Sequence, residues 1–212
     1  LRLEDIKPFL KQDSLQVLKG NISADLKVKG LIRDFNSLTY SGKAKIRNAG
    51  FKDLRLPSVV IDNLSCDITF DANKILIETL TALFNSEQLK GNAVIDSKKI
   101  KADIDLQKYK HNELAIENIK GKITYSDNVI SSNDLKFNVF GGSVSSKNCK
   151  LIFAQKENIL NANCEVKNIN IKQAFKTLDN FSQNVITDKN LEGNLSANGV
   201  LNLYFDKDFN FL

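Results

Sequence analysis

The sequence predicts a mainly β protein, an antiparallel repeating sheet with one or two short amphipathic helices. A phrase of an aliphatic residue, a charged residue and glycine recurs at Leu18, Leu89, Ile119 and Leu191. Each copy opens a stretch in which apolar and polar residues alternate, and a period of two places the apolar side chains on one face of a strand. Two short stretches have the helical period instead. We therefore expect a repeat of half-buried strands.

Composition bounds the class of protein. The chain has 212 residues, 42% of them hydrophobic, which is enough for a core. No apolar run reaches the ~18 residues that span a bilayer, and the absence of methionine predicts a fragment of a longer chain, with residues 1–212 forming a single elongated β-repeat region. The net charge of +5 comes from lysines spread one per pleat, a pattern typical of a solvated strand face. Nucleic acid is therefore not an expected partner.

The first elements are a helix and two strands. Asp5 is a candidate N-cap for a helix from Asp5 to Leu10, with Pro8 in its first turn. Alternation predicts strands from Leu18 to Val28 and from Ser41 to Ala49, and Phe51 to Pro57 is expected to be a connection.

A hairpin follows. Leu64 to Phe70 alternates cleanly, Asp71 to Asn73 has turn chemistry, and the returning strand includes Ile75 and Ile77. Whether Leu80 to Phe84 continues that strand stays open. The next predicted strands are Leu89 to Ile95, Ile100 to Leu106, Ile119 to Tyr125 and Leu135 to Val139, with a polar turn from Tyr109 to Glu113.

The last third contains a bend, a hairpin and a helix. Gly141 and Gly142 predict a bulge or sharp bend, and Lys147 to Phe153 with Ile159 to Val166 predicts a second hairpin. Behind Asn170 as N-cap, apolar residues recur with helical spacing to Leu178. This helix aligns with the one at Asp5 at an offset of 165, so one long period closes near residues 166–176.

The three cysteines lack the C-x-x-C spacing of a zinc site. Cys66 is interpreted as a small buried hydrophobe. If Lys156 and Glu157 form the tip of their hairpin, Cys149 lies opposite Cys164 at a distance that a disulfide accepts. The alternative is two packed thiols without a bond, because a shift of the hairpin register by one residue is enough to separate the two cysteines.

The search for catalytic groups finds none that converge, so the protein is not expected to be an enzyme, and no cofactor or metal is expected. His111 lies in a predicted polar turn. Asp103 and Asp105 share a strand face with the pattern of surface residues, and Asp206 to Asn210 has the opening spacing of an EF-hand loop without its glycine. P-loop, dinucleotide and nucleophile-elbow motifs are absent.

The chain resembles the AsmA-like family of bacterial envelope proteins, particularly their C-terminal region. The resemblance rests on the L-x-G phrases, on F-x-V-F-G-G-S-V from Phe137 to Val144, on N-I-N-I-K-Q-A-F from Asn168 to Phe175 and on the stretch from Leu191 to Leu201. It implies an elongated, curved antiparallel sheet with an apolar trough, held in the periplasm by an N-terminal membrane helix outside this chain. It also implies a role in outer-membrane biogenesis and phospholipid movement.

Two functions remain open: a groove for lipid acyl chains, and a structural or adhesive β-repeat that binds envelope proteins along its edge. The apolar alternation without helices to cover it favours the groove, with a phospholipid or other acyl lipid as the partner. The residues predicted to line it are Ile22, Leu26, Ala44, Ile46, Ile68, Phe70, Ile75, Ile77, Ile104, Ile123, Phe137, Leu151, Leu195 and Leu203.

Overall fold

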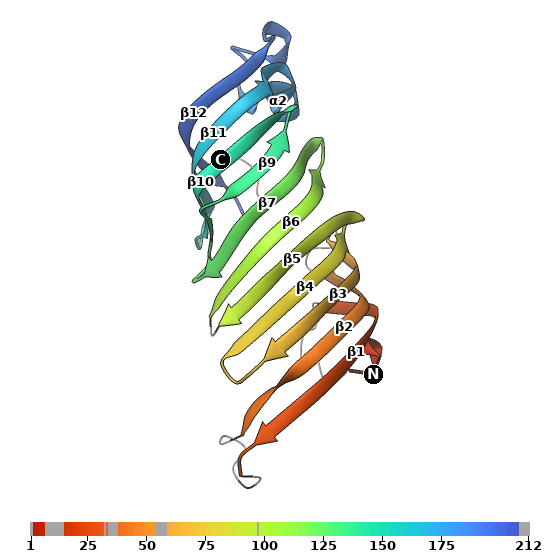
Figure 1. Cartoon of the computed structure of the whole chain (residues 1–212). Helices are drawn as coiled ribbons and strands as arrows, with labels where there is room; N and C mark the ends of the chain where they lie inside the picture. The colour runs from red at the N-terminus through yellow and green to blue at the C-terminus, as the bar shows by residue number, and fades with distance from the viewer. Residues whose placement is uncertain are drawn as a thin grey trace. The chain divides into compact units, whose positions relative to one another are not determined.

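The protein is mainly β, as the alternation predicts. The computed structural model describes residues 2–6, 15–31, 33, 38–53, 59–96 and 98–207. Its strands form one antiparallel sheet in the order β1-β2-β3-β4-β5-β6-β7-β8-β10-β11-β12, and β9 pairs with both β7 and β10 (Figure 1). The strands are β1 (Leu15–Lys29), β2 (Thr39–Asp53), β3 (Val60–Phe70), β4 (Lys74–Phe84), β5 (Glu87–Asp96), β6 (Lys99–His111), β7 (Leu114–Ser126), β8 (Val129–Ser132), β9 (Leu135–Val139), β10 (Gly142–Phe153), β11 (Asn158–Asn170) and β12 (Asn194–Phe205).

The chain divides into two compact units, which we call unit 1 (Leu1–Ala102) and unit 2 (Asp103–Leu212). Unit 1 contains the short helix α1 (Leu3–Ile6) and the meander β1 to β5, in which each strand pairs with the next. Since antiparallel partners point to the same face, the register places the alternating apolar residues of these strands together.

In unit 2, two short strands, β8 and β9, lie one after the other between β7 and β10. β8 pairs with one end of β7 and β10, and β9 pairs with the other end of the same two strands. β10, β11 and β12 then complete the sheet. Between β11 and β12 lie the helix α2 (Ile171–Thr177) and two short 3-10 turns, η3 (Asp179–Ser182) and η4 (Asp188–Asn190).

α2 begins where the sequence predicts. The side-chain oxygen of Asn170 accepts a hydrogen bond from the backbone N–H of Gln173 at 2.8 Å, which satisfies one of the donors that a helix start leaves open. Ala174 is buried against Val139, Val144 and Ile169. The N-cap prediction is confirmed.

β-Bulges with left-handed backbone interrupt the strands of unit 1. Asn48, Asn63 and Thr79 have φ near +50°, and each lies at a register shift of β2, β3 or β4. Asn168 repeats this arrangement in β11. Within the described ranges, eight of the fourteen non-glycine residues with positive φ are asparagine, which tolerates this conformation better than most residues.

Several predicted boundaries are wrong. α1 begins at Leu3 and not at Asp5, and the rest of the predicted helix lies outside the described residues. β2 continues through Phe51 to Asp53, so the predicted connection starts too early. β6 continues through His111, which moves the predicted turn to the two residues before Leu114. β4 runs to Phe84 and settles the open question about that segment.

An arginine joins β2 to β3 on the polar face. Arg47 donates from Nη1 to the carbonyls of Ile46 and Cys66, both at 2.8 Å, and from Nη2 to the Asp67 carboxylate at 2.6 Å. This hydrogen bond and the guanidinium charge hold the pKa of Asp67 below its usual range.

We expect the contribution of Asp67 to stability to depend on pH. A carboxyl group whose pKa is lowered by folding stabilises the protein above its unfolded pKa of about 4 and loses this effect as pH falls through the folded value. The melting temperature of Asp67→Asn should therefore lie below that of the parent protein at pH 7, and the difference should shrink as the solution is acidified. Thermal unfolding followed by circular dichroism measures this. In an Arg47→Gln background the pH dependence of the difference should largely vanish; a difference that is constant with pH in the parent would contradict the assignment.

Candidate functional site

The candidate site in unit 1 is the apolar face of β1 to β5. One row across the strands consists of Ala24, Ala44, Ile68, Ile77 and Ala93, each paired with the next in the register. The neighbouring rows contain the other predicted groove residues of this unit, namely Ile22, Leu26, Ile46, Phe70 and Ile75. The register therefore brings all the groove residues predicted in unit 1 to one face.

One end of this face is covered. Leu3 of α1 and Ala49 of β2 are 4% and 0% exposed and pack with the partly buried Ile22, Ile46 and Leu64. Two of the predicted groove residues, Ile22 and Ile46, thus belong to a small core under α1.

The other end of the face is open. Leu26, Val28 and Tyr40 are 60%, 54% and 50% exposed, and the Tyr40 ring lies 6.5 Å from the Phe70 ring. A Cβ built on Gly42 meets the Phe70 ring at 3.0 Å, so glycine allows this ring to lie close over β2. We call Leu26, Val28, Tyr40, Phe70 and Ile75 the open apolar patch. A group of neighbouring large apolar side chains that are exposed to solvent is typical of a binding surface.

Unit 2 has a second apolar face. Ile123, Cys149, Ala162 and Leu201 share one row that also includes Ser132. Tyr125, Ile130, Leu151, Leu160 and Leu203 form the next row. These rows contain the predicted residues Ile123, Leu151 and Leu203.

The remaining predicted residues lie toward α2 or on β6. Phe137 packs against the core of Val139, Val144, Ile169 and Ala174. Leu195 pairs with Ile169 and is 44% exposed.

Ile104 is placed through its neighbour. Asp105 forms an ion pair with Lys120, 3.0 Å between carboxylate and ammonium, on the polar face that Lys120 shares with Lys136. Successive strand residues point to opposite faces, so Ile104 faces the apolar side.

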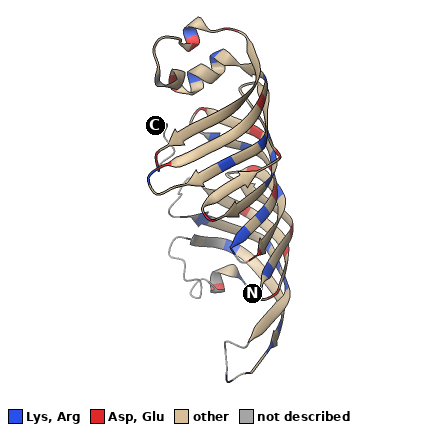
Figure 2. Ribbon diagram, turned by 90° about the vertical axis from the view of Figure 1, so that its left-hand side faces the viewer, with Lys and Arg blue, Asp and Glu red and all other residues tan. Residues whose placement is uncertain are grey.

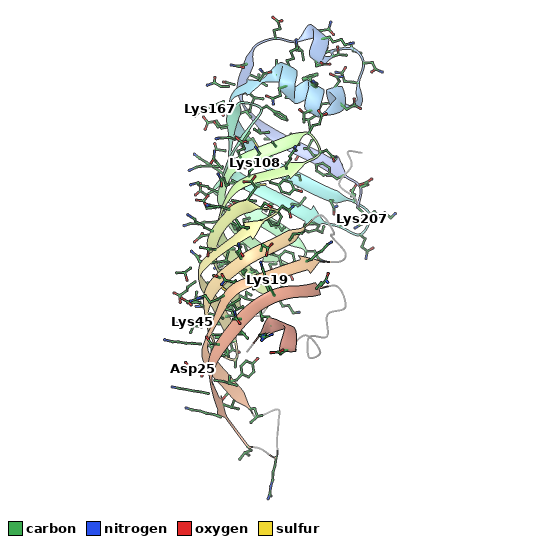
Figure 3. All side chains as sticks on the ribbon, turned by 90° about the vertical axis from the view of Figure 1, so that its right-hand side faces the viewer. Lys19, Asp25, Lys45, Lys108, Lys167 and Lys207 are labelled. Carbon is green, nitrogen blue, oxygen red and sulfur yellow. The ribbon has the colours of Figure 1, made fainter. Side chains whose placement is uncertain are left out.

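The opposite face of each unit is polar. Asp25, Lys43 and Thr69 form one row in unit 1, and Figure 3 shows Asp25 and Lys45 projecting away from the side on which α1 lies. Lysine, arginine and acidic residues are spread along the strands (Figure 2). A shallow cavity of about 730 Å³ lies in unit 1. Besides Gly42 and Leu76 it is lined by Leu26 and Phe70 of the open apolar patch, and its polar lining residues are Asp25, Lys27, Ser41, Lys43, Thr69, Asp71 and Lys74. The cavity therefore adjoins the open apolar patch and shares Leu26 and Phe70 with it.

The predicted opposition of Cys149 and Cys164 is wrong. The structure pairs Cys149 with Ala162 and Cys164 with Ser146, and the three cysteines are free thiols in it. Burial raises the pKa of all three thiols, and Cys66 is buried, as expected of a small apolar residue.

The other residues that the sequence analysis considered for catalysis or metal binding lie at separate places in the structure. Asp105 is engaged by Lys120, and Asp103 is exposed on the same strand. His111 ends β6, and Asp206 follows β12 in a turn whose continuation lies outside the described residues. In the described part of the chain, no cluster of three or more histidine, cysteine or acidic residues has metal-binding geometry.

The sequence prediction missed part of the site. Val28 and Tyr40 lie at the ends of the alternating stretches and are among the most exposed apolar residues of unit 1. The signal was present, because both continue the period-two pattern.

No helix among the described residues is both long enough and apolar enough to cross a membrane. Comparisons with profiles of protein families, with curated protein sequences and with solved structures found no match to this chain.

Proposed function

We propose that the apolar faces of the two units bind lipid acyl chains, without covalent chemistry, in a protein of the bacterial envelope. The observation that supports this most directly is the open apolar patch, where Leu26, Val28 and Tyr40 remain at least half exposed beside a register-aligned apolar surface. Burial of one methylene group contributes about 0.8 kcal/mol, so a chain of several methylenes is held by burial alone.

Small residues in the apolar rows fit a chain lying across the strands. Ala24, Ala44 and Ala93 flank Ile68 and Ile77 in unit 1, and Ala162 lies between Cys149 and Leu201 in unit 2. Since the contacts are apolar, the surface discriminates weakly between head groups. The resemblance to the AsmA-like family supports a periplasmic location, a tether to the inner membrane outside this chain, and a part in outer-membrane biogenesis or in phospholipid transport between membranes along a curved sheet.

Neighbouring residues on opposite faces provide a matched test. Leu201 belongs to the apolar face and is 40% exposed, whereas Val200, opposite Asn163 on the polar face, is 72% exposed. We expect Leu201→Asp to weaken uptake of a fluorescent phospholipid at least about tenfold, because losing the burial of two methylenes amounts to roughly 1.6 kcal/mol. Val200→Asp should leave uptake unchanged.

Native mass spectrometry after lipid extraction gives the second readout. Co-purified phospholipid should be present in the parent and depleted in a Leu26→Asp/Leu201→Asp variant that keeps its circular dichroism spectrum. A parent protein that carries no lipid and takes up none would contradict the proposal.

A structural or adhesive scaffold is the second candidate. The observation that favours it is β12, whose residues from Asn194 to Asn202 are all exposed at the end of the strand order. Lipid-free protein that captures an extended peptide would support this candidate instead.

A further inference from the structure

The sheet of unit 1 has a step at one end. β3 turns back toward β4 at Asp71, and the last pair between β2 and β3 is Gly42 with Phe70. β1 and β2 continue past this turn, where Tyr40 pairs with Val28 (Figure 1). Among the residues that the structure describes, no strand lies beside β2 beyond Gly42 on the side of β3. The apolar face and the polar face of the sheet therefore meet at this step.

Apolar side chains lie on one side of the step. Tyr40 and Phe70, whose ring centroids are 6.5 Å apart, belong with Leu26 to the open apolar patch. Leu26 and Phe70 also line the cavity of about 730 Å³, and Tyr40 lines a smaller hollow of about 310 Å³. The two hollows share Lys27 and Ser41, so they adjoin each other and together border the patch.

Four lysines surround the same two hollows. Lys27, Lys43 and Lys74 line the larger one, and Lys29 joins the smaller one. All four are exposed, and in the described part of the chain none of them forms an ion pair. Neighbouring strands lie only about 4.8 Å apart, and each ammonium group stands on a flexible stem, so the four charges can converge on one anion.

Two carboxylates at these hollows leave the positive charge in excess. Asp71 accepts hydrogen bonds from the backbone N–H groups of Asn73 and Lys74, both at 2.9 Å, and this turn fixes where Lys74 starts β4. Asp25 lies opposite Lys43 in the register. The residues that line the two hollows thus carry four positive and two negative charges.

We propose that this step is the head-group site of an anionic phospholipid. The phosphate lies among Lys27, Lys43 and Lys74, and the acyl chains lie on the open apolar patch. Ser41 and Thr69 add hydroxyl donors to the lining of the larger cavity. Because the two faces meet at the step, one lipid reaches both of them around the end of β3. The inference rests on the proposed function and adds a preference between head groups that apolar contacts do not supply.

Two lipids that differ only in the head group test the proposal with the intact chain. The probes are phosphatidylglycerol and phosphatidylcholine with the same fluorescent acyl chain. We expect phosphatidylglycerol to bind about tenfold more tightly at low salt, since several exposed ion pairs of modest strength add up. The preference should fall in about 1 M salt, which screens charges beyond about 3 Å. Equal binding of the two lipids would overturn the head-group site and leave acyl-chain binding standing, whereas no binding of either would overturn both.

A triple variant locates the site. Lys27→Gln/Lys43→Gln/Lys74→Gln should abolish the preference for phosphatidylglycerol and leave the affinity for phosphatidylcholine unchanged, because glutamine keeps a polar side chain without the charge. A preference that survives in this variant would overturn the assignment.

The control removes the same charge elsewhere in unit 1. This is needed because residues 1–102 contain 17 Lys and Arg against 12 Asp and Glu, which is the whole net charge of the chain. Lys45→Gln/Lys90→Gln/Lys101→Gln changes three exposed lysines that line neither hollow, and it should keep the preference. An equal loss in the two triple variants would assign the preference to the long-range field of the unit and overturn the site.

Inorganic phosphate distinguishes a lipid head group from a free anion. In about tenfold excess over phosphatidylglycerol it should displace little of the lipid, because burial of the acyl chain contributes most of the affinity. Displacement of most of the lipid at that excess would assign the step to a free anion and overturn the proposal.

Discussion

Gly20→Ala should unfold the α1–β1 end of unit 1, with a loss of about 3 kcal/mol or more in local stability. Two costs add in this substitution. A Cβ on Gly20 lies 2.7 Å from both the Ala49 Cα and the Leu3 side chain, and overpacking of this kind costs about 1–3 kcal/mol. The φ of +138° adds backbone strain of roughly 1–3 kcal/mol for any residue with a side chain.

Gly193→Ala is the matched control. Its φ is also positive, but a Cβ there has no atom within 4 Å, so only the backbone cost remains. Hydrogen exchange of the amides in β1 and β2, compared with those in β11 and β12, measures the local free energies of opening. Equal losses at the two glycines would show that close packing between Leu3 and Ala49 contributes little.

Ala174→Asp should detach α2 from the end of the unit 2 sheet. Ala174 is 8% exposed and packs with Val139, Val144 and Ile169, which offer a carboxylate no partner. An uncompensated buried charge costs about 3–5 kcal/mol, more than a short helix gains from its own hydrogen bonds.

The control for this substitution is Gln173→Asp, which adds the same charge at an exposed position in the first turn of α2, where the helix dipole favours it. Hydrogen exchange of α2 and binding of a hydrophobic dye report the detachment. If the α2 amides of the Ala174→Asp variant stay protected from hydrogen exchange, the expectation is wrong, and the helix instead tilts to expose the new carboxylate.

The alternation of apolar and polar residues was sufficient to predict every strand except β8 and most members of the apolar face. Ile68, Phe70, Ile75 and Ile77 lie together because side-chain direction in a strand depends only on parity, which sequence shows directly. The same pattern could not show which end of the face is covered. That depends on where Leu3 packs, a contact between distant segments.

Register was predicted less well because turns and bulges add residues that parity does not reveal. The turn from Ala154 to Glu157 is closed by a hydrogen bond between these two residues and centres the hairpin one residue earlier than predicted. An extra residue between Ser146 and Asn148 then shifts the register again. The turn alone makes Ala162 the partner of Cys149, and the extra residue makes Ser146 the partner of Cys164. The asparagines at left-handed positions were the available signal, and in the sequence alone they look like a compositional bias.

The meander of unit 1 has a consequence for how the protein folds and unfolds. Each of β2, β3 and β4 pairs with the strands before and after it in the chain, so most stabilising contacts are local in sequence. In such an array the total stability approximates a sum of strand terms and nearest-neighbour terms. Formation can begin at any hairpin and spread outward by zippering, with little loop entropy lost at each step. Heat or force then removes strands one after another from an end of the sheet, and unfolding is cooperative only as far as neighbouring strands stabilise each other.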